Sequence, residues 1–359
     1  MKKKKTVLVG MSGGVDSSVC AALLKKRGYN VIGITMQLLP DEKVQASTCC
    51  NLSAISDAKR VAQKLGIRHY TINSRESFKK NVIDSFIGEY LKGQTPNPCV
   101  ECNRFIKFDE LLKKAPTFDA DFVATGHYCL RTYSPKTKKY FLKKGKDPKK
   151  DQSYFLYMIP QEKLSKIIFP LGGYNKTQIR EMANEWGLIN ANKKESQEIC
   201  FVPKSYKDYI EQNVDTSKFA SGNVVDIDGN KLGEHNGLYN YTVGQRKGLG
   251  ITSNIPKYVL KIDFKNNHLV VGDADELNTQ IINIKTFTKI DTDEELVGKT
   301  FSMKLRYQMS DIKITVSKEG NDEATITTEI PQAFVASGQS AVLYDKDRVV
   351  GGGVIRTGD

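Results

Sequence analysis

Short apolar runs alternate with amphipathic stretches over the first half of the chain. The run from Thr6 to Val9 predicts a buried strand, and the stretch after it has the apolar spacing of a helix that ends at Gly28. The run from Val31 to Met36 is rich in β-branched residues and predicts a second strand. Strand, helix and strand in this order form a βαβ unit, in which the two strands are parallel.

The same alternation continues as far as Trp186. We expect a helix at 55–65, a strand at 69–72, a helix at 78–91 and a strand at 122–125, followed by further helical patterns. In an open parallel sheet, ligands bind at the carboxyl ends of the strands. Met36 and His127, which stand at the ends of two predicted strands, are therefore candidates for a site there. A methionine that fills core and a structural histidine are the alternatives.

The pattern changes near Tyr206, after which short β-rich runs alternate with turns. Asp228-Gly229-Asn230 lies between two such runs and predicts a hairpin. Further strands are expected at 258–264, 268–271, 281–287, 301–307, 312–316, 324–330, 342–344 and 349–355. The predicted fold class is α/β followed by all-β. A Rossmann-like parallel sheet (residues 1–205) precedes a small β-rich central domain (206–272) and an antiparallel β-barrel (273–359).

The turn between the first strand and the first helix is rich in glycine. It reads Gly10-Met11-Ser12-Gly13-Gly14-Val15-Asp16-Ser17-Ser18. Backbone N–H groups of such a turn converge on an anion, and the helix N-terminus adds partial positive charge. The serines supply hydroxyl donors, and Asp16 can hold a magnesium ion against the same phosphates. The segment lacks a Walker A ending and the G-x-G-x-x-G pattern, so it indicates neither a P-loop kinase nor a dinucleotide fold. Glycine used only for turn geometry is the alternative.

The composition is that of an ordinary soluble protein with an anionic partner. The chain has 359 residues, of which 39% are hydrophobic and 26% charged, and its net charge is +13. This excess favours a polyanion such as nucleic acid, although a lysine-rich proteome would produce it too. No apolar run is long enough to span a membrane, and the basic start lacks the apolar segment of a signal peptide. We therefore expect a cytoplasmic location.

Seven cysteines, an odd number in such a chain, indicate thiol chemistry rather than a disulfide framework. Cys99 and Cys102 form a CxxC motif, and Pro96 and Pro98 predict an extended loop that leads into a helix. A thiol at a helix N-terminus ionises more readily. CxxC alone fits a redox pair, half a zinc site or a structural turn, and no second CxxC or HxxxH completes a zinc site.

The remaining cysteines carry less information. Cys200 lies far along the chain from the CxxC motif, and on spacing alone it fits a buried, inert thiol. Cys49 and Cys50 are adjacent, which disfavours an unstrained disulfide between them, and we interpret them as structural or incidental.

A basic stretch covers residues 136–150. It contains eight lysines and one acidic residue, interleaved with Tyr140 and Phe141. A solvated charged surface is the usual meaning of such a run. Because it ends abruptly in Lys150-Asp151-Gln152, we favour a nucleic-acid contact.

Together these segments identify a family resemblance. The glycine-rich loop resembles the pyrophosphate loop of N-type ATP pyrophosphatases, which adenylate an oxygen and release pyrophosphate. Eight segments in order resemble the tRNA-specific 2-thiouridylase family over nearly the whole chain: GMSGGVDSS, TPNPCVECNRFIKF, ATGHY, KDQSYFL, SQEICFVP, YTVGQRKGLG, KLRYQ and SGQSAVLYD. This family replaces the C2 oxygen of the wobble uridine in the tRNA anticodon with sulfur.

The resemblance implies a mechanism for this chain. ATP with Mg²⁺ adenylates the uridine oxygen, and a persulfide on Cys200, loaded by a sulfur-relay donor protein, supplies the sulfur. Cys102 is then the partner thiol, which frees the sulfide or forms a disulfide with Cys200. AMP and pyrophosphate are released. An ordinary thiol has a pKa of ~8.5 and is only a few per cent ionised at neutral pH, so the loop around Cys102 must favour the thiolate.

The resemblance also implies the binding residues. ATP would be bound by Gly10, Met11, Ser12, Gly13, Gly14, Val15, Asp16, Ser17, Met36 and Gly126, and the target base by Asn97, Pro98 and Cys99. Contacts to tRNA would come from His127, Lys150, Asp151, Gln152, Arg306, Tyr307 and Gln339. The base must leave its stack to react.

Cys99 departs from the common form of the family pattern, in which aspartate stands at this position. Three thiols, Cys99, Cys102 and Cys200, are therefore candidates to converge on one point. Three thiolates with an open iron position would hold a [4Fe–4S] cluster that can bind sulfide. We favour the persulfide mechanism and keep the cluster as the alternative.

Two further classes compete with this interpretation. Another ATP pyrophosphatase, similar to argininosuccinate synthetase or tRNA(Ile)-lysidine synthetase, would not need paired thiols. A non-catalytic RNA-binding protein would use the lysine run and the barrel without consuming ATP. One chain carries all the motifs, so a monomer suffices.

Overall fold

The computed structural model describes residues 3–40, 52–193, 199–203, 205–216, 219–290 and 294–357. Cys49, Cys50 and residues 194–198 of the SQEICFVP segment lie outside the described residues. The chain divides into two compact units, which are described separately below. The first comprises residues 1–83, 98–203 and 347–349, and the second comprises residues 84–97, 204–346 and 350–359.

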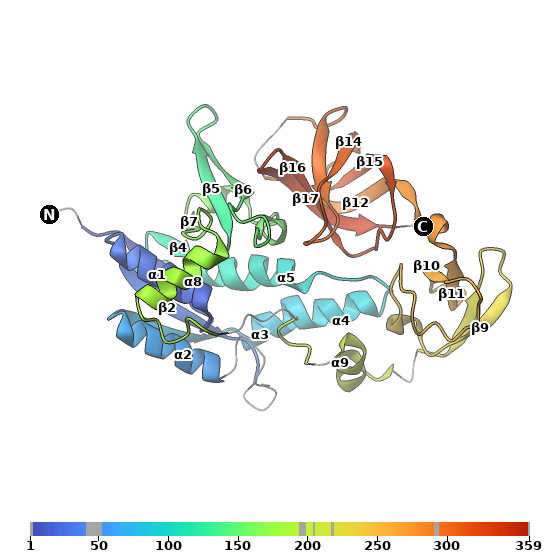
Figure 1. Ribbon diagram of the computed structural model, residues 1–359, viewed down its shortest axis with the longest axis horizontal. Helices are drawn as coiled ribbons and strands as arrows, with labels where there is room; N and C mark the ends of the chain where they lie inside the picture. Colours follow the sequence, from blue (N-terminus) through green and yellow to red (C-terminus); the bar gives the residue numbers. More distant parts are fainter. Residues whose placement is uncertain are drawn as a thin grey trace. The chain divides into compact units, whose positions relative to one another are not determined.

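A parallel sheet forms the centre of the first unit (Figure 1). Its five strands are β1 (Thr6–Gly10), β2 (Asn30–Gln37), β3 (Arg68–Asn73), β4 (Phe122–Ala124) and β7 (Ile167–Ile168), in the order β3-β2-β1-β4-β7. β1 pairs in parallel with both β2 and β4, and its side chains are almost fully buried. The predicted βαβ opening is confirmed. The strand order reverses between β1 and β4, which is where an open α/β sheet forms its ligand crevice.

Several helices accompany this sheet. They are α1 (Val15–Lys26), α2 (Leu52–Lys64), α3 (Arg75–Phe78), α7 (Gln161–Leu164) and α8 (Lys176–Glu185), with π-helical and 3₁₀ turns at η2 (Lys79–Ile83), η4 (Pro116–Phe118) and η5 (Ser153–Phe155). α1 and α8 lie side by side (Figure 1). Val19 and Leu24 of α1 and Ile179 of α8 belong to one core cluster with β1. This packing fixes the start of α8 near the start of α1.

The CxxC segment is helical from its second proline onward. α5 (Pro98–Glu101), the π-helical η3 (Cys102–Phe108) and α6 (Asp109–Lys114) follow one another without a break. The sequence predicted an extended loop through both prolines, but Pro98 is the first helical residue. Proline is well suited to that position because the first N–H of a helix has no intrahelical acceptor. Cys99 therefore lies in the first turn.

The basic stretch forms a hairpin that the sequence analysis did not predict. β5 (Cys129–Ser134) pairs antiparallel with β6 (Lys139–Lys144), and the ribbon projects from the first unit (Figure 1). Tyr133 and Tyr140 face each other across it with ring centroids 5.0 Å apart. The two-residue strand β7 was also missed, because helical patterns were expected throughout that region.

The second unit contains a small sheet and a closed barrel. The small sheet has the order β10-β11-β8-β9, from β8 (Gly222–Val225), β9 (Lys231–His235), β10 (Tyr258–Asp263) and β11 (His268–Gly272). The antiparallel pairing of β8 with β9 confirms the predicted hairpin at Asp228-Gly229-Asn230. The short helices of this unit are α4 (Asp84–Tyr90), α9 (Tyr206–Asn213), η7 (Leu238–Asn240) and η8 (Ala274–Leu277).

The barrel is antiparallel, and its strands follow the order β12-β15-β14-β13-β16-β17. They are β12 (Thr279–Lys289), β13 (Thr300–Lys304), β14 (Ile312–Glu319), β15 (Glu323–Gln332), β16 (Ser340–Asp345) and β17 (Arg348–Arg356). Pairing of β12 with β17 closes it, and inward side chains such as Ile284, Ile326 and Leu343 fill its core. The predicted fold class is confirmed, with a parallel α/β sheet followed by β-structure that ends in a barrel.

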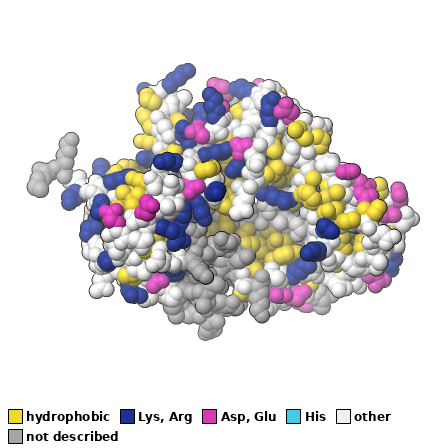
Figure 2. Space-filling model, in the orientation of Figure 1, with side chains coloured by type: hydrophobic (Ala, Val, Ile, Leu, Met, Phe, Trp, Pro, Cys, Tyr) yellow, Lys and Arg dark blue, Asp and Glu magenta, His cyan; other side chains and the backbone are white. Residues whose placement is uncertain are grey.

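Two properties of the surface bear on partners. Lys and Arg side chains are widespread on the face shown in Figure 2, with Asp and Glu side chains between them. Within the described part of the chain, no helix is both long enough and apolar enough to cross a membrane.

Candidate functional site

The glycine-rich loop forms a tight turn from β1 into α1. Gly13 has a φ of +71°, and a Cβ there would lie 2.3 Å from the carbonyl oxygen of Ala54, so only glycine fits. Gly14 is the N-cap of α1 without a capping side chain. The backbone N–H of Ser12 donates to Ser17 Oγ at 3.2 Å, and Ser17 Oγ donates to the carbonyl of Gly14. These contacts hold the loop over the N-terminus of α1, which favours a bound anion.

Gly126 bounds the same space from β4. A Cβ at this position would lie 2.8 Å from both the carbonyl carbon of Asp16 and the backbone nitrogen of Ser17. The chain after β4 therefore passes against the first turn of α1 at a distance that only glycine permits. The structure thus brings together Gly126 and the loop from Gly10 to Ser17. Met36 is half-buried at the end of the neighbouring β2. Their roles in ATP binding remain predictions.

Two residues from the segment after α8, Asn190 and Lys193, form hydrogen bonds with the glycine-rich loop. Asn190 Nδ2 donates to the carbonyl of Gly13 at 3.1 Å and to Ser18 Oγ at 2.8 Å. Lys193 Nζ donates to the same Gly13 carbonyl at 3.3 Å and forms an ion pair with Asp57 at 2.7 Å. Both side chains donate to the Gly13 carbonyl, so together they hold the loop in this conformation.

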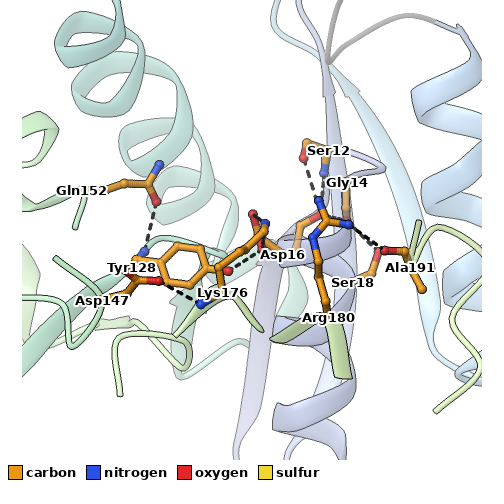
Figure 3. Close-up of polar contacts among 11 residues, drawn as sticks. Ser12, Gly14, Asp16, Ser18, Tyr128, Asp147, Gln152, Lys176, Arg180 and Ala191 are labelled. Atoms are coloured by element: carbon orange, nitrogen blue, oxygen red, sulfur yellow. Dashed lines mark hydrogen bonds and ion pairs between the residues drawn. The ribbon is translucent and has the colours of Figure 1, made fainter. Parts of the chain in front are cut away.

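Asp16 lies in the first turn of α1 and accepts three hydrogen bonds (Figure 3). Lys176 Nζ donates to Oδ1 at 2.7 Å and to Oδ2 at 2.9 Å, and the Tyr128 hydroxyl donates to Oδ1 at 2.6 Å. The sequence analysis assigned Asp16 to magnesium but did not single out Lys176 or the Tyr128 side chain. A carboxylate with serine hydroxyls beside it is an oxygen donor set that suits Mg²⁺.

Hydrogen bonds connect the segment from Asp147 to Gln152, which includes residues predicted to contact tRNA, to Tyr128 and Lys176 beside Asp16. Gln152 Oε1 accepts from the backbone N–H of Tyr128 at 3.0 Å, and Gln152 N–H donates to the Tyr128 carbonyl (Figure 3). Asp147 Oδ2 accepts from the first N–H of α8, at Lys176, at 3.0 Å. Asp151 is buried and accepts from the N–H groups of Gly145 and Ser153. Lys150 is half-buried beside them.

His127, predicted to contact tRNA, is only 6% exposed. Its Nδ1 lies 2.7 Å from Thr125 Oγ1, and its ring packs against Phe108 and Phe169. Burial, with a smaller contribution from Lys107, holds the pKa of His127 well below its ordinary value of 6.5. The ring is therefore neutral at physiological pH. A role in binding tRNA stays a prediction, and one exerted through the fold around it fits this placement better than a surface contact.

The helical segment that begins at Cys102 and the residue next to Cys200 both contact α3. Cys102, the first residue of η3, is buried and 7% exposed, and η3 lies beside α3. Phe201, next to Cys200, packs edge-on against Phe78 at the end of α3, with ring centroids 5.7 Å apart. Cys200 is half-buried and Cys99 is exposed.

The other two described cysteines are unsuited to nucleophilic chemistry. Cys20 in α1 and Cys129 in β5 are fully buried, and burial raises the pKa of each thiol above its ordinary value. Across the described ranges, no three His, Cys, Asp or Glu side chains are grouped as a metal site. Cys99, Cys102 and Cys200 are therefore not arranged as the three ligands of a cluster.

The predicted residues in the second unit lie on the barrel and on the chain leading to Asn97. Gln339 Nε2 donates to the carbonyl of Thr95 at 3.1 Å, two residues before Asn97. Gly338 packs so closely on Thr95 that a Cβ would lie 2.8 Å from its backbone nitrogen. Arg306 is exposed and donates to the carbonyl of Phe334, and Tyr307 is half-buried. Gln339 thus contacts the segment directly before residues 97–99, which are predicted to contact the base.

Besides Tyr128, the sequence analysis missed three residues that contact the loop or the start of α1: Lys176, Asn190 and Lys193. Each meets the loop across more than 150 residues of chain, so no local pattern reveals the contact. One signal was available for Lys176. Asn175 and Gln178 form a capping box, which makes Lys176 the first helical residue. A cation there opposes the helix dipole, which indicates a strong anionic partner elsewhere.

Comparisons with known proteins agree along the chain. Family models described as tRNA methyl transferase HUP domain, tRNA methyl transferase PRC-barrel domain and aminomethyltransferase beta-barrel domain match residues 5–204, 207–273 and 279–355. The tRNA-specific 2-thiouridylase MnmA of Acetivibrio thermocellus is 46% identical over 358 residues, covering 98% of this chain and 99% of that protein. Its namesake in Clostridioides difficile is 47% identical over 360 residues, covering 99% of each. A solved 4-thiouridine synthetase–RNA complex with bound ATP aligns at a TM-score of 0.34 and 20% identity, over 58% of this chain and 50% of that one. At 46–47% identity over nearly full length, the chain belongs to the tRNA-specific 2-thiouridylase family.

Proposed function

We propose that this protein uses ATP to replace the C2 oxygen of the anticodon wobble uridine of tRNA with sulfur carried as a persulfide on Cys200. The observation that carries the proposal is that one compact unit holds both an anion-binding loop and the two thiols. The loop lies at the strand reversal between β1 and β4, while η3, which begins at Cys102, and Phe201, next to Cys200, both contact α3. An anion site alone would support adenylation, and the thiols supply the replacement atom.

The residues take the following roles in this proposal. The N–H groups of the loop and the start of α1 hold the phosphates of ATP, and Asp16 holds the magnesium ion that accompanies them. The uridine oxygen attacks the α-phosphorus, and the bond to pyrophosphate breaks. The Cys200 persulfide then attacks C2, AMP leaves with the oxygen, and Cys102 attacks the remaining disulfide to release the thiolated base. Cys102 and Cys200 end as a disulfide, which a thiol reductant must open.

The sulfur donor is a persulfide-carrying protein, and tRNA is the macromolecular substrate. The net charge of +13 supports a polyanionic partner. Cys99 is exposed and Asn97 is half-buried, which supports their proposed contact with the base, whereas Pro98 between them is buried. We infer that residues 1–205 form the catalytic domain. Residues 206–272 and 273–359 then form a central domain and a barrel that contribute to tRNA binding. A monomer in the cytoplasm is sufficient for the reaction.

A thiolation assay tests the proposal. Purified protein, Mg·ATP, a persulfide donor and a tRNA anticodon stem should yield RNA that migrates slowly in a mercury-containing gel. Cys200→Ala and Cys102→Ala should each abolish the retarded band. Cys50→Ala is the matched control, because the persulfide mechanism assigns no role to that thiol. A retarded band from Cys200→Ala would contradict the proposal and favour an ATP pyrophosphatase of another kind.

The cluster alternative has its own measurement. Three ligands for a [4Fe–4S] cluster are not grouped among the residues the structure describes, so we route no step through it. Anaerobically purified protein should contain iron far below one cluster per chain. Stoichiometric iron that disappears in Cys99→Ser, together with loss of thiolation, would overturn the persulfide mechanism.

A further inference from the structure

Lys176 stands where a cation is electrostatically out of place. It is the first residue of α8, whose first turn contains no acidic residue, and the helix dipole presents partial positive charge there. Its side chain is only 12% exposed. A nearly buried ammonium needs a strong anionic partner to offset its lost hydration. In this structure that partner is Asp16 of α1, 160 positions earlier in the chain.

The pair lies at the proposed phosphate site (Figure 3). Both carboxylate oxygens of Asp16 accept from Lys176, at 2.7 and 2.9 Å. The backbone nitrogen next to Asp16, that of Ser17, belongs to the first turn of α1, and Gly126 bounds it from β4. Lys176 Nζ is therefore bonded to Asp16, the residue directly before Ser17, whose backbone N–H is among those that would bind phosphate.

The loading of Mg·ATP changes the best partner of each group. Asp16 is a hard oxygen ligand, and a divalent cation competes strongly for it. Lys176 then loses its carboxylate, while the polyphosphate introduces several anionic oxygens beside it. A lysine ammonium is a compact point charge that binds phosphate well from a flexible stem. Tyr128, which also donates to Asp16, still holds the carboxylate in place during this exchange.

We propose that Lys176 is a ligand of the pyrophosphate part of ATP, and that Asp16 holds its ammonium at the site until Mg·ATP binds. This inference rests on the proposed function, in which ATP is the substrate. The backbone around Lys176 is fixed for the task. The backbone N–H of Lys176 donates to Asp147 Oδ2 at 3.0 Å, and the side chains of Asn175 and Gln178 form the capping box at this end of α8. Only the side chain has to move.

Equilibrium binding tests the proposal without turnover. Dissociation constants for Mg·ATP, Mg·pyrophosphate and AMP are measured for the wild type and Lys176→Met. We expect Lys176→Met to bind Mg·ATP and Mg·pyrophosphate about tenfold or more weakly, because a charge-assisted hydrogen bond is lost. AMP, which lacks the pyrophosphate part, should bind within about twofold of the wild type. Lys163→Met is the matched control, since Lys163 forms an ion pair of the same length, 2.7 Å, with Asp109.

Lys176→Gln guards against failure of the first variant to fold, because glutamine can still donate to Asp16 while lacking the charge. A purely structural clamp between α1 and α8 would lower the melting temperature of the variants and leave Mg·ATP affinity unchanged, and that result overturns the proposal. Weakened AMP binding with unchanged pyrophosphate binding overturns it as well. Failure of the wild type to bind Mg·ATP at all would instead refute the proposed function, and this inference with it.

Discussion

At the scale of single residues, the anion site depends on backbone positions where no side chain fits. Gly13 adopts a positive φ and packs against the carbonyl of Ala54, while Gly126 packs against the first turn of α1. The sequence indicated the first of these through the spacing of glycines in the loop. The family resemblance named Gly126, but the local pattern gave no physical reason for a glycine there, because the contact joins the chain after β4 to α1 across more than 100 residues. Glycine at both places lets the loop pack against Ala54 and the chain after β4 pack against the N-terminus of α1.

Gly13→Ala should therefore impair both folding and nucleotide binding. The new Cβ meets backbone atoms of Ala54 and the φ of +71° becomes strained, so we expect a loss of about 1–3 kcal/mol or more in unfolding free energy. Mg·ATP affinity should fall with it. Urea unfolding and equilibrium dialysis measure the two effects. Gly173→Ala is the control, because its Cβ would meet nothing within 4 Å, and an equal loss there would contradict this account.

His127 should make stability depend on pH. Its folded pKa lies well below 6.5, so the unfolded chain binds a proton that the buried ring does not. Stability is then complete above pH 6.5 and falls as the pH drops below it, by up to ~1.4 kcal/mol per pH unit for one proton. Urea titrations of wild type and His127→Gln between pH 7 and 5 should show a shallower decline in the variant. A decline in His127→Gln as steep as that of the wild type would contradict this account.

At the scale of elements, local patterns predicted most of the secondary structure and little of its pairing. The strands of the barrel were expected near their observed positions because they are short, β-branched and separated by turns. The hairpin β5–β6 was missed, since its lysines obscure the alternation of side chains across the ribbon. β7 was missed because two residues cannot establish a period. The helix at the CxxC motif was expected, but its start was placed after Pro98, whereas Pro98 is itself the first helical residue.

The segment after the hairpin should contribute to tRNA affinity through charge. Lys150 lies beside Gln152, whose side chain accepts a hydrogen bond from the backbone N–H of Tyr128, while Lys114 lies exposed at the end of α6, outside the basic stretch. Lys150→Gln should weaken anticodon-stem binding and reduce the slope of log K against log salt concentration by about one. Filter binding at several salt concentrations measures both effects. Lys114→Gln is the charge-matched control, and equal slopes for the two variants would contradict a specific role of Lys150.

At the scale of the whole molecule, the family segments and the compact units divide the chain differently. The HUP-domain match runs through residues 5–204, whereas residues 84–97 within it belong to the second compact unit. Sequence comparison follows descent along the chain, and compactness follows contacts in space. All residues predicted to bind ATP lie in the first unit, from Gly10 to Ser17 with Met36 and Gly126. Gln339, Arg306 and Tyr307, predicted to contact tRNA, lie in the second.

Nucleotide binding should therefore protect the two units unequally. A ligand that binds only the folded state stabilises it by about 2.7 kcal/mol at a concentration 100 times its dissociation constant. Local opening reactions inherit that gain only where they disrupt the ligand site. Hydrogen exchange of the full chain, with and without Mg·ATP, should slow most in β1 and the first turn of α1, and least in β14 and β15 of the barrel. AMP at the same saturation is the control, because it occupies the site without the pyrophosphate part. With AMP bound, hydrogen exchange near Asp16 should be faster than with Mg·ATP bound. Equal protection of α1 and β14 would contradict an ATP site confined to the first unit.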